Sequence, residues 1–147
     1  MGDLSKLRVL SGADRWLLLE AMVWLSLMRV AIALLPFRRI TTLLRLIPGE
    51  SPTELAEALR PPALRIGWAV RAAATRTPWE STCLMQALAG SVLLCRRDIH
   101  STLYLGVAKD TTVPAGLAAH AWLRCGDAIL TGSAGRERFS VVSTFTS

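Results

Sequence analysis

The sequence predicts an α+β fold, in which helices come first and a small antiparallel sheet follows. Apolar residues recur at helical spacing over most of residues 16–97, whereas short, β-rich segments fill residues 101–145. Gly126-Asp127 separates two of these segments, as in a two-residue hairpin turn. The length of 147 residues suits one compact domain. Within it, we expect an N-terminal helical docking region over 1–50 and a core over 51–147.

Composition narrows the classes of partner. Hydrophobic residues make up 52% of the chain and the mean hydropathy is +0.39, which excludes a mainly disordered protein. The net charge of +6 comes from dispersed Lys and Arg without a basic run or interleaved aromatic residues. We therefore expect no nucleic-acid partner, and some apolar surface that faces another protein or a membrane.

The first predicted helix covers residues 16–37. Glu20 and Arg29 interrupt its apolar sequence, and a central Arg costs about 2.5–3.5 kcal/mol in a membrane span. A helix packed on the domain or a partner is therefore favoured over a spanning one, with an interfacial helix as the intermediate alternative. Pro36 should end or kink the helix.

The remaining elements follow from caps and spacing. Ser51-Pro52-Thr53-Glu54 has the pattern of a capping box and predicts a helix start, which Pro61-Pro62 should interrupt. Other helices are expected over 39–47, 63–75 and 81–97, and strands over 101–107, 117–125, 128–131 and 139–145.

Cys83 is the candidate nucleophile. It falls in the first turn of the 81–97 helix, where unpaired N–H groups and the helix dipole favour a thiolate and can bind an oxyanion. The alternative is a small buried hydrophobic residue. Cys95 is expected to lie in the core, and Cys125 is expected to be structural. No spacing suits a metal, and no cofactor is expected. Unpaired thiols and the lack of a secretory signal pattern indicate the cytoplasm, with membrane association open.

His120 is the candidate general base. It lies inside an apolar predicted strand, whereas His100 falls in a loop between a helix and a strand. A helix with a thiol at its start, packed on a strand with an imidazole, is the arrangement that a Cys–His pair requires. A structural core histidine is the alternative reading of His120.

Three segments resemble one family. They are Pro78 to Ala87 with Cys-Leu-x-x-Ala, Leu105-Gly106-Val107, and Ala119 to Leu123 with His-Ala-Trp. In this order the chain resembles the leader peptidases (B2 proteins) of lasso-peptide biosynthesis, a branch of the transglutaminase-like cysteine peptidases with a papain/transglutaminase-like core. The likeness extends from the Leu-rich N-terminal helix to the last strand.

The resemblance implies a hydrolase that removes the leader from a ribosomally made lasso precursor peptide. A separate leader-recognition (B1) protein and an ATP-dependent lasso cyclase would be its partners. Relatives usually carry an Asp about a dozen residues after the His, but residues 130–133 contain no carboxylate. Asp127 is the nearest substitute, yet a turn at Gly126-Asp127 would place it roughly 20 Å from His120. The hairpin instead places Gly132 or Ser133 opposite, so Ser133, a backbone carbonyl or a water could orient the imidazole.

Two alternatives to the peptidase stay open. An acyl transferase would use the same acyl-enzyme with an amine in place of water. A catalytically idle module would only bind a peptide or the cyclase, and the missing carboxylate favours that reading.

Overall fold

The computed structural model describes residues 10–147 and has the predicted α+β architecture. The helices are α2 (Gly12–Leu34), α3 (Phe37–Leu43), α4 (Arg60–Ala74) and α5 (Cys83–Cys95), with short 3-10 helices η1 (Glu57–Leu59) and η2 (Arg136–Arg138). The strands are β1 (Ile47–Pro48), β2 (Thr102–Lys109), β3 (Leu117–Cys125), β4 (Ala128–Thr131) and β5 (Ser140–Thr146). They form one antiparallel sheet in the order β1-β5-β2-β3-β4.

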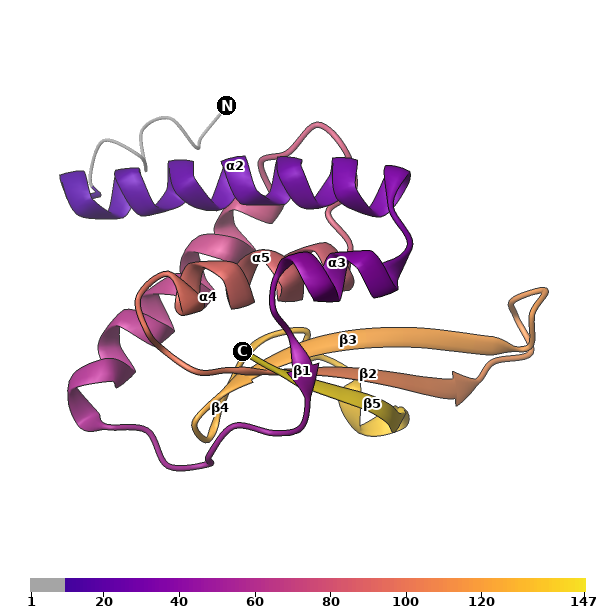
Figure 1. Ribbon diagram of the computed structural model, residues 1–147. Helices are drawn as coiled ribbons and strands as arrows, with labels where there is room; N and C mark the ends of the chain where they lie inside the picture. Colours follow the sequence, from indigo (N-terminus) through magenta and orange to yellow (C-terminus); the bar gives the residue numbers. More distant parts are fainter. Residues whose placement is uncertain (1–9) are drawn as a thin grey trace.

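The helices cover one face of the sheet in two layers, as Figure 1 shows. α4 and α5 lie between the sheet and α2, which is the outermost helix. Ser11 caps α2 by accepting a hydrogen bond from the Asp14 N–H at 3.1 Å. Leu35, which precedes Pro36, is already extended, so the predicted first helix and its end are confirmed.

The predicted helix start at Ser51 is wrong. Residues 50–56 contain no helix, and Pro61 and Pro62 lie in the first turn of α4 instead of interrupting a helix. The Ser51 N–H donates to the Thr102 hydroxyl at 2.8 Å, so this serine serves the sheet and not a helix. The helix predicted over 39–47 is also too long, because Ile47 and Pro48 pair with β5.

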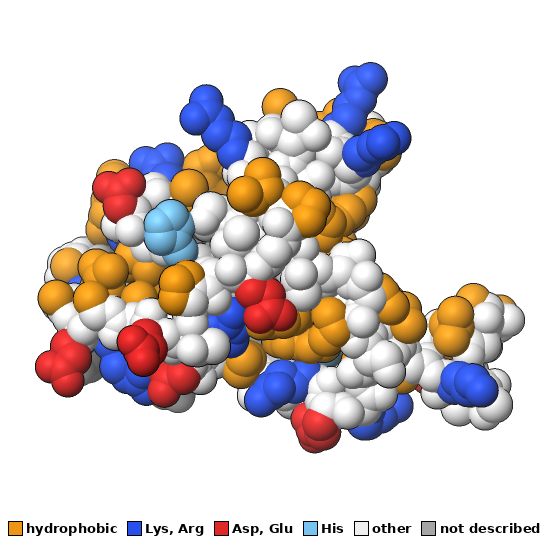
Figure 2. Space-filling model, turned by 60° about the horizontal axis from the view of Figure 1, so that its bottom comes forward, with side chains coloured by type: hydrophobic (Ala, Val, Ile, Leu, Met, Phe, Trp, Pro, Cys, Tyr) orange, Lys and Arg blue, Asp and Glu red, His pale blue; other side chains and the backbone are white. Residues whose placement is uncertain are grey.

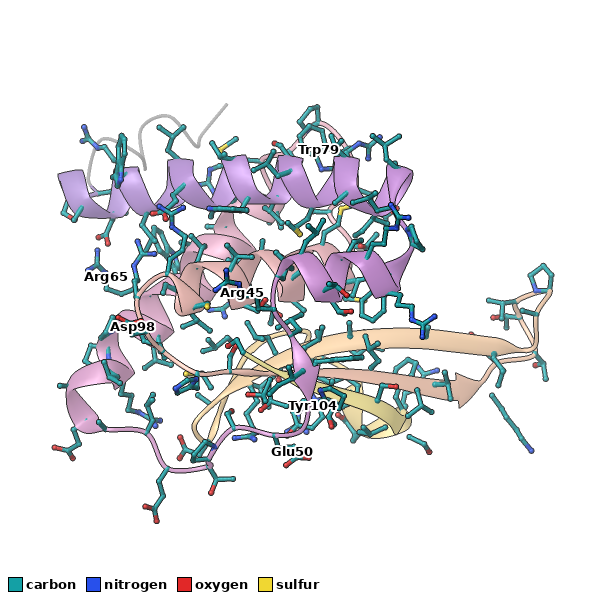
Figure 3. All side chains as sticks on the ribbon, viewed as in Figure 1. Arg45, Glu50, Arg65, Trp79, Asp98 and Tyr104 are labelled. Carbon is teal, nitrogen blue, oxygen red and sulfur yellow. The ribbon has the colours of Figure 1, made fainter. Side chains whose placement is uncertain are left out.

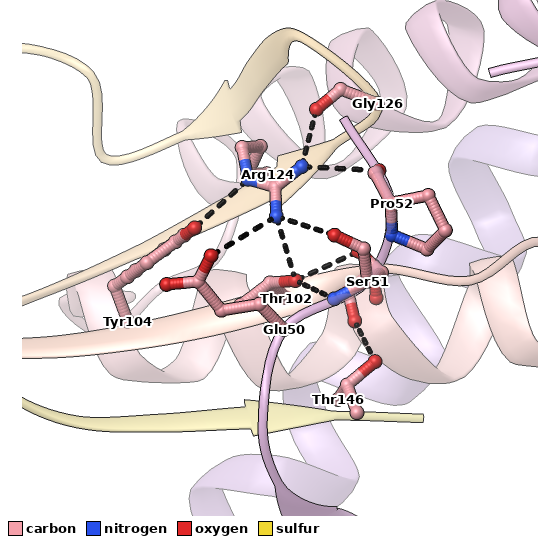
Figure 4. A network of polar contacts seen from close by, with 9 residues as sticks. Glu50, Ser51, Pro52, Thr102, Tyr104, Arg124, Gly126 and Thr146 are labelled. Carbon is pink, nitrogen blue, oxygen red and sulfur yellow. Dashed lines mark hydrogen bonds and ion pairs between the residues drawn. The ribbon is translucent and has the colours of Figure 1, made fainter. Parts of the chain in front are cut away.

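Arg124 fixes this irregular segment to the sheet (Figure 4). Arg124 is 7% exposed, and its side chain donates to the Ser51 carbonyl at 2.8 Å, the Pro52 carbonyl at 3.2 Å and the Tyr104 hydroxyl at 2.9 Å. Figure 3 shows Tyr104 and Glu50 on the side of the sheet away from the helices. The planar guanidinium can serve several acceptors at once, which an ammonium cannot do in this geometry.

α5 lies very close to the sheet because of Gly90. A Cβ built at Gly90 would be 2.7 Å from the Leu123 side chain of β3. A larger residue would therefore lift the helix from the strand. Since Cys83 is the first residue of α5, this contact also sets the position of the candidate nucleophile.

Replacing Arg124 by Leu should lower the free energy of unfolding by at least about 2 kcal/mol, because each buried acceptor left unsatisfied costs about 1–3 kcal/mol. Urea unfolding measures the loss, and the exposed Arg136→Leu serves as control. Equal stability of the two variants would show that the 50–52 segment is held by other contacts.

Candidate active site

Cys83 is the first residue of α5 and is half-buried. Thr82 caps the helix, and its hydroxyl accepts a hydrogen bond from the Met85 N–H at 3.3 Å. The first N–H groups of a helix have no intrahelical acceptor, so those of Cys83 and Leu84 can bind an oxyanion that forms beside the thiol. The predicted local setting of Cys83 is therefore present.

A cavity of about 290 Å³ adjoins Cys83. Its wall is almost entirely apolar and consists of Cys83, Leu84, residues 105–107 of β2, residues 119–121 of β3, and Val142 of β5. Cys83 and the β3 segment with His120 thus meet at one cavity. Its size suits one side chain of a peptide rather than a large cofactor.

The His120 imidazole is held by a backbone carbonyl. Its Nε2 lies 2.7 Å from the Gly132 oxygen. A carbonyl oxygen only accepts hydrogen bonds, so Nε2 carries the hydrogen and Nδ1 of the neutral ring carries the lone pair. The ring also lies against Trp122 and Phe139, at centroid distances of 5.7 and 5.0 Å. Nδ1 is therefore the atom that can accept a proton.

Strand alternation determines which way this ring points. Leu123 faces α5, as its approach to Gly90 shows, and Ala121 shares that buried face. Side chains at even positions of β3 leave the strand on the other face, so His120 and Trp122 point away from α5. Both residues border one cavity, but no hydrogen bond between the Cys83 thiol and the His120 imidazole occurs among the described residues.

Asp127 and Ser133, the two side chains suggested to orient His120, form no hydrogen bond with it. Asp127 is exposed in the hairpin turn and forms an ion pair with Arg60 at 2.6 Å, and this hydrogen bond lowers the pKa of Asp127. Ser133 is exposed, and the preceding residue supplies the atom that binds His120. The backbone carbonyl, one of the expected alternatives, is thus the group that orients the imidazole. The catalytic roles of Cys83 and His120 remain predictions.

The remaining thiols and the second histidine lie away from this cavity. Cys125 is 1% exposed, and burial raises the pKa of its thiol. Cys95 was expected in the core but is exposed, because it ends α5 where the chain turns outward. His100 Nδ1 lies 2.7 Å from the Ser147 carbonyl. No group of three or more His, Cys, Asp or Glu residues in the range 10–147 could hold a metal.

Sequence reasoning missed two neighbours of His120. Trp122 could have been found, since the second residue along a strand shares the same face. Phe139 comes from the chain between β4 and β5, and no local pattern indicates where that chain crosses the sheet. Gly132 has a φ of +71°, a conformation that favours glycine, but a glycine alone does not reveal which side chain its carbonyl binds.

A cysteine that begins a helix, packed on an antiparallel sheet that carries a histidine, is the framework on which a Cys–His acyl-transfer site can be built. A family model of the transglutaminase-like superfamily matches residues 22–144, and the chain belongs to that superfamily. Its fold is generally that of Cys–His peptidases and transferases. No curated protein and no solved structure matches the chain significantly.

Gly132→Ala should destabilise the chain more than Gly135→Ala, as thermal melting can measure. Both glycines have positive φ, +71° and +75°, so both variants carry a backbone cost of about 1–2 kcal/mol. Only at Gly132 would the Cβ meet neighbours, with Trp122 Cβ at 2.9 Å, whereas nothing lies within 4 Å at Gly135. The His120 hydrogen bond should be lost in the first variant alone, which the ¹⁵N shifts of the imidazole report. Equal effects would contradict the close packing at Gly132.

Proposed function

We propose that this chain is a cysteine peptidase that removes the leader from a lasso precursor peptide in the cytoplasm. The observation that carries the proposal is the placement of Cys83 at the start of α5, on a cavity that also borders His120 of β3. Membership of the transglutaminase-like superfamily supports the chemistry. The lasso substrate rests on the sequence resemblance described above.

The proposed reaction follows from these groups. Cys83 Sγ attacks the scissile carbonyl carbon, and the thiol proton passes to His120 Nδ1. Backbone N–H groups at the start of α5 bind the oxyanion. Collapse of the tetrahedral intermediate breaks the C–N bond, and the amine leaves with the proton from Nδ1. Water then attacks the thioester, returns a proton to Cys83 through His120, and releases the leader.

This mechanism requires the imidazole to come within hydrogen-bonding distance of Sγ. Catalytic hydrogen bonds often tighten only when substrate binds. Gly106, the cross-strand partner of His120, adjoins an irregularity in the pairing of β2 with β5. The pairing of β2 with β3 is regular, and the extra residue, Val142, lies in β5 and lines the cavity at Cys83. We propose that substrate binding rearranges the sheet at this point and brings Nδ1 to the thiol.

The partners follow from the proposed substrate. The precursor leader peptide would be presented by a separate B1 protein, because the sequence before residue 40 lacks the strand-and-turn pattern of a leader-recognition domain. An ATP-dependent lasso cyclase would then use the new N-terminus. The apolar cavity at Cys83 suits a small or apolar side chain next to the scissile bond.

A second candidate function is an idle binding module. The orientation of His120 toward Gly132 and away from α5 favours it, since a thiol without a base reacts slowly with amides. An acyl transferase would share every step up to the thioester, and mass analysis of the product distinguishes water from an amine as acceptor.

Cys83→Ala and His120→Ala should each reduce leader release by about 10³-fold or more, because the nucleophile and base act as one unit. His100→Ala and Cys95→Ala are matched controls that should retain activity. The assay combines the full chain, the precursor peptide encoded nearby and the B1 protein, with mass spectrometry of the products. Normal release by the Cys83 variant would refute the mechanism.

A thiol-directed electrophile attached to the leader sequence separates the peptidase from the idle module. It should label Cys83 in the wild-type chain and much more slowly in His120→Ala. Equal labelling of both proteins would mean that His120 does not activate the thiol. No labelling of a folded wild-type chain would favour the idle module.

Asp127→Asn and Ser133→Ala should leave the rate of leader release within a few-fold of wild type. Neither side chain contacts His120 in the structure, whereas loss of a true triad carboxylate costs up to about 10⁴-fold. Asn also suits the turn that Asp127 occupies. A collapse of activity in the Asp127 variant at an unchanged melting temperature would mean that the hairpin rearranges during catalysis.

A further inference from the structure

The outer face of α2 is a stripe of exposed apolar side chains. The stripe consists of Trp16 (68% exposed), Leu19 (53%), Val23 (50%), Leu27 (47%), Val30 (54%) and Leu34 (75%). Leu17, Leu25 and other residues of the opposite face are buried in the core. The helix is long and apolar enough to cross a membrane by length and composition, but 28% of its most apolar window is buried in the protein. A helix with an apolar face on each side has a second surface to cover.

The stripe runs straight along the helix. Its residues follow the 3.6-residue period, and Trp16 and Leu34 are separated by five full turns, or about 27 Å. A straight stripe suits a flat surface, whereas a coiled-coil partner selects a 3.5-residue period.

Cations border this stripe. Arg96 and Arg97 lie along one side of it and, with α2 residues, enclose a groove of about 590 Å³. They also pair with Glu20, the acidic residue in this groove, at 3.5 and 2.9 Å. Arg29 of α2 lies over the Trp79 ring at 5.3 Å, and Figure 3 shows Trp79 beside α2. Two arginines against one glutamate leave a net positive charge beside the stripe.

We propose that the outer face of α2 binds the surface of an anionic lipid bilayer, with the helix parallel to the membrane plane. Apolar side chains and Trp16 would enter the headgroup boundary, while the arginines contact lipid phosphates. α2 cannot span the membrane, because its inner face would then have to leave the protein. Moving Leu17 and Leu25 into lipid would open the core. The charge pattern favours anionic lipid over a second copy of this cationic face.

This orientation leaves the candidate site in water. In Figure 1 the sheet lies on the opposite side of α4 and α5 from the outer face of α2. Figure 2, turned so that the bottom of the molecule comes forward, shows side chains of both charges among hydrophobic ones. The proposal is independent of the peptidase activity and would hold for an idle module as well.

Sedimentation of the full chain with phospholipid vesicles tests this proposal. Binding should be strong to vesicles that mix phosphatidylglycerol with phosphatidylcholine, weak to pure phosphatidylcholine, and reduced at about 0.5 M NaCl, where screening shortens electrostatic range. Absence of binding to the anionic vesicles, or equal binding to both kinds, would overturn the proposal.

A variant pair locates the contact. The double variant Val23→Glu, Leu27→Glu should weaken vesicle binding at least about tenfold, since it places two charges where apolar groups would be buried. Val141→Glu, at a residue with similar exposure on β5, is the matched control and should bind like wild type. Unchanged melting temperatures verify folding. Equal binding by both variants would overturn the proposal. The proposal would also be overturned if light scattering showed a dimer without vesicles and the double variant were a monomer.

Discussion

The close contact of α5 with β3 governs the rest of this structure. Gly90 lets the helix approach until the Leu123 side chain occupies the space of a missing Cβ. α4 packs on both α5 and β4, and α2 packs on α4 and α5, so this contact helps to set the height of the helical layer above the sheet. Cys83, at the start of the same helix, is placed over β2 and β3 as a consequence. The position of Cys83, the candidate nucleophile, is thus set by core packing rather than by its own contacts.

The same packing also determines that the His120 side chain points away from Cys83. A strand whose odd residues are buried under α5 must direct its even residues to the other face. His120 belongs to the even set, together with Trp122 and Arg124, and there it finds the Gly132 carbonyl. That carbonyl fixes the tautomer that a general base needs. It holds the ring, however, on the face of the sheet away from the Cys83 thiol. If Cys83 and His120 act as a catalytic pair, a local change in the sheet must bring them together, whereas an idle module would not need one.

The parts predicted from the sequence are those set by local rules. The α+β class, the end of α2 at Pro36, the helix that begins at Cys83 and the hairpin at Gly126-Asp127 follow from periodicity, caps and turn residues. The errors have long-range causes. Ser51 has a helix-capping pattern, yet its backbone binds residues at least 51 positions away. Its N–H donates to the Thr102 hydroxyl, and its carbonyl accepts from Arg124. At His120 the hairpin register correctly predicts Gly132 or Ser133 as the neighbour, but it cannot decide between a side chain, a backbone carbonyl and a water.

α2 has one apolar face buried in the core and a second apolar face exposed on the outside of the protein. Glu20 and Arg29 are the residues that argue against a spanning helix, and both have partners in the protein. Arg97 neutralises Glu20 beside the apolar stripe, and Arg29 lies over Trp79, four residues before Cys83 in the sequence. The charges that a bilayer core would reject therefore sit at the border between the two faces of the helix, where headgroups and water can solvate them. If α2 lies on lipid, the segment that leads into the candidate nucleophile is joined to the membrane-bound helix through this cation–π contact.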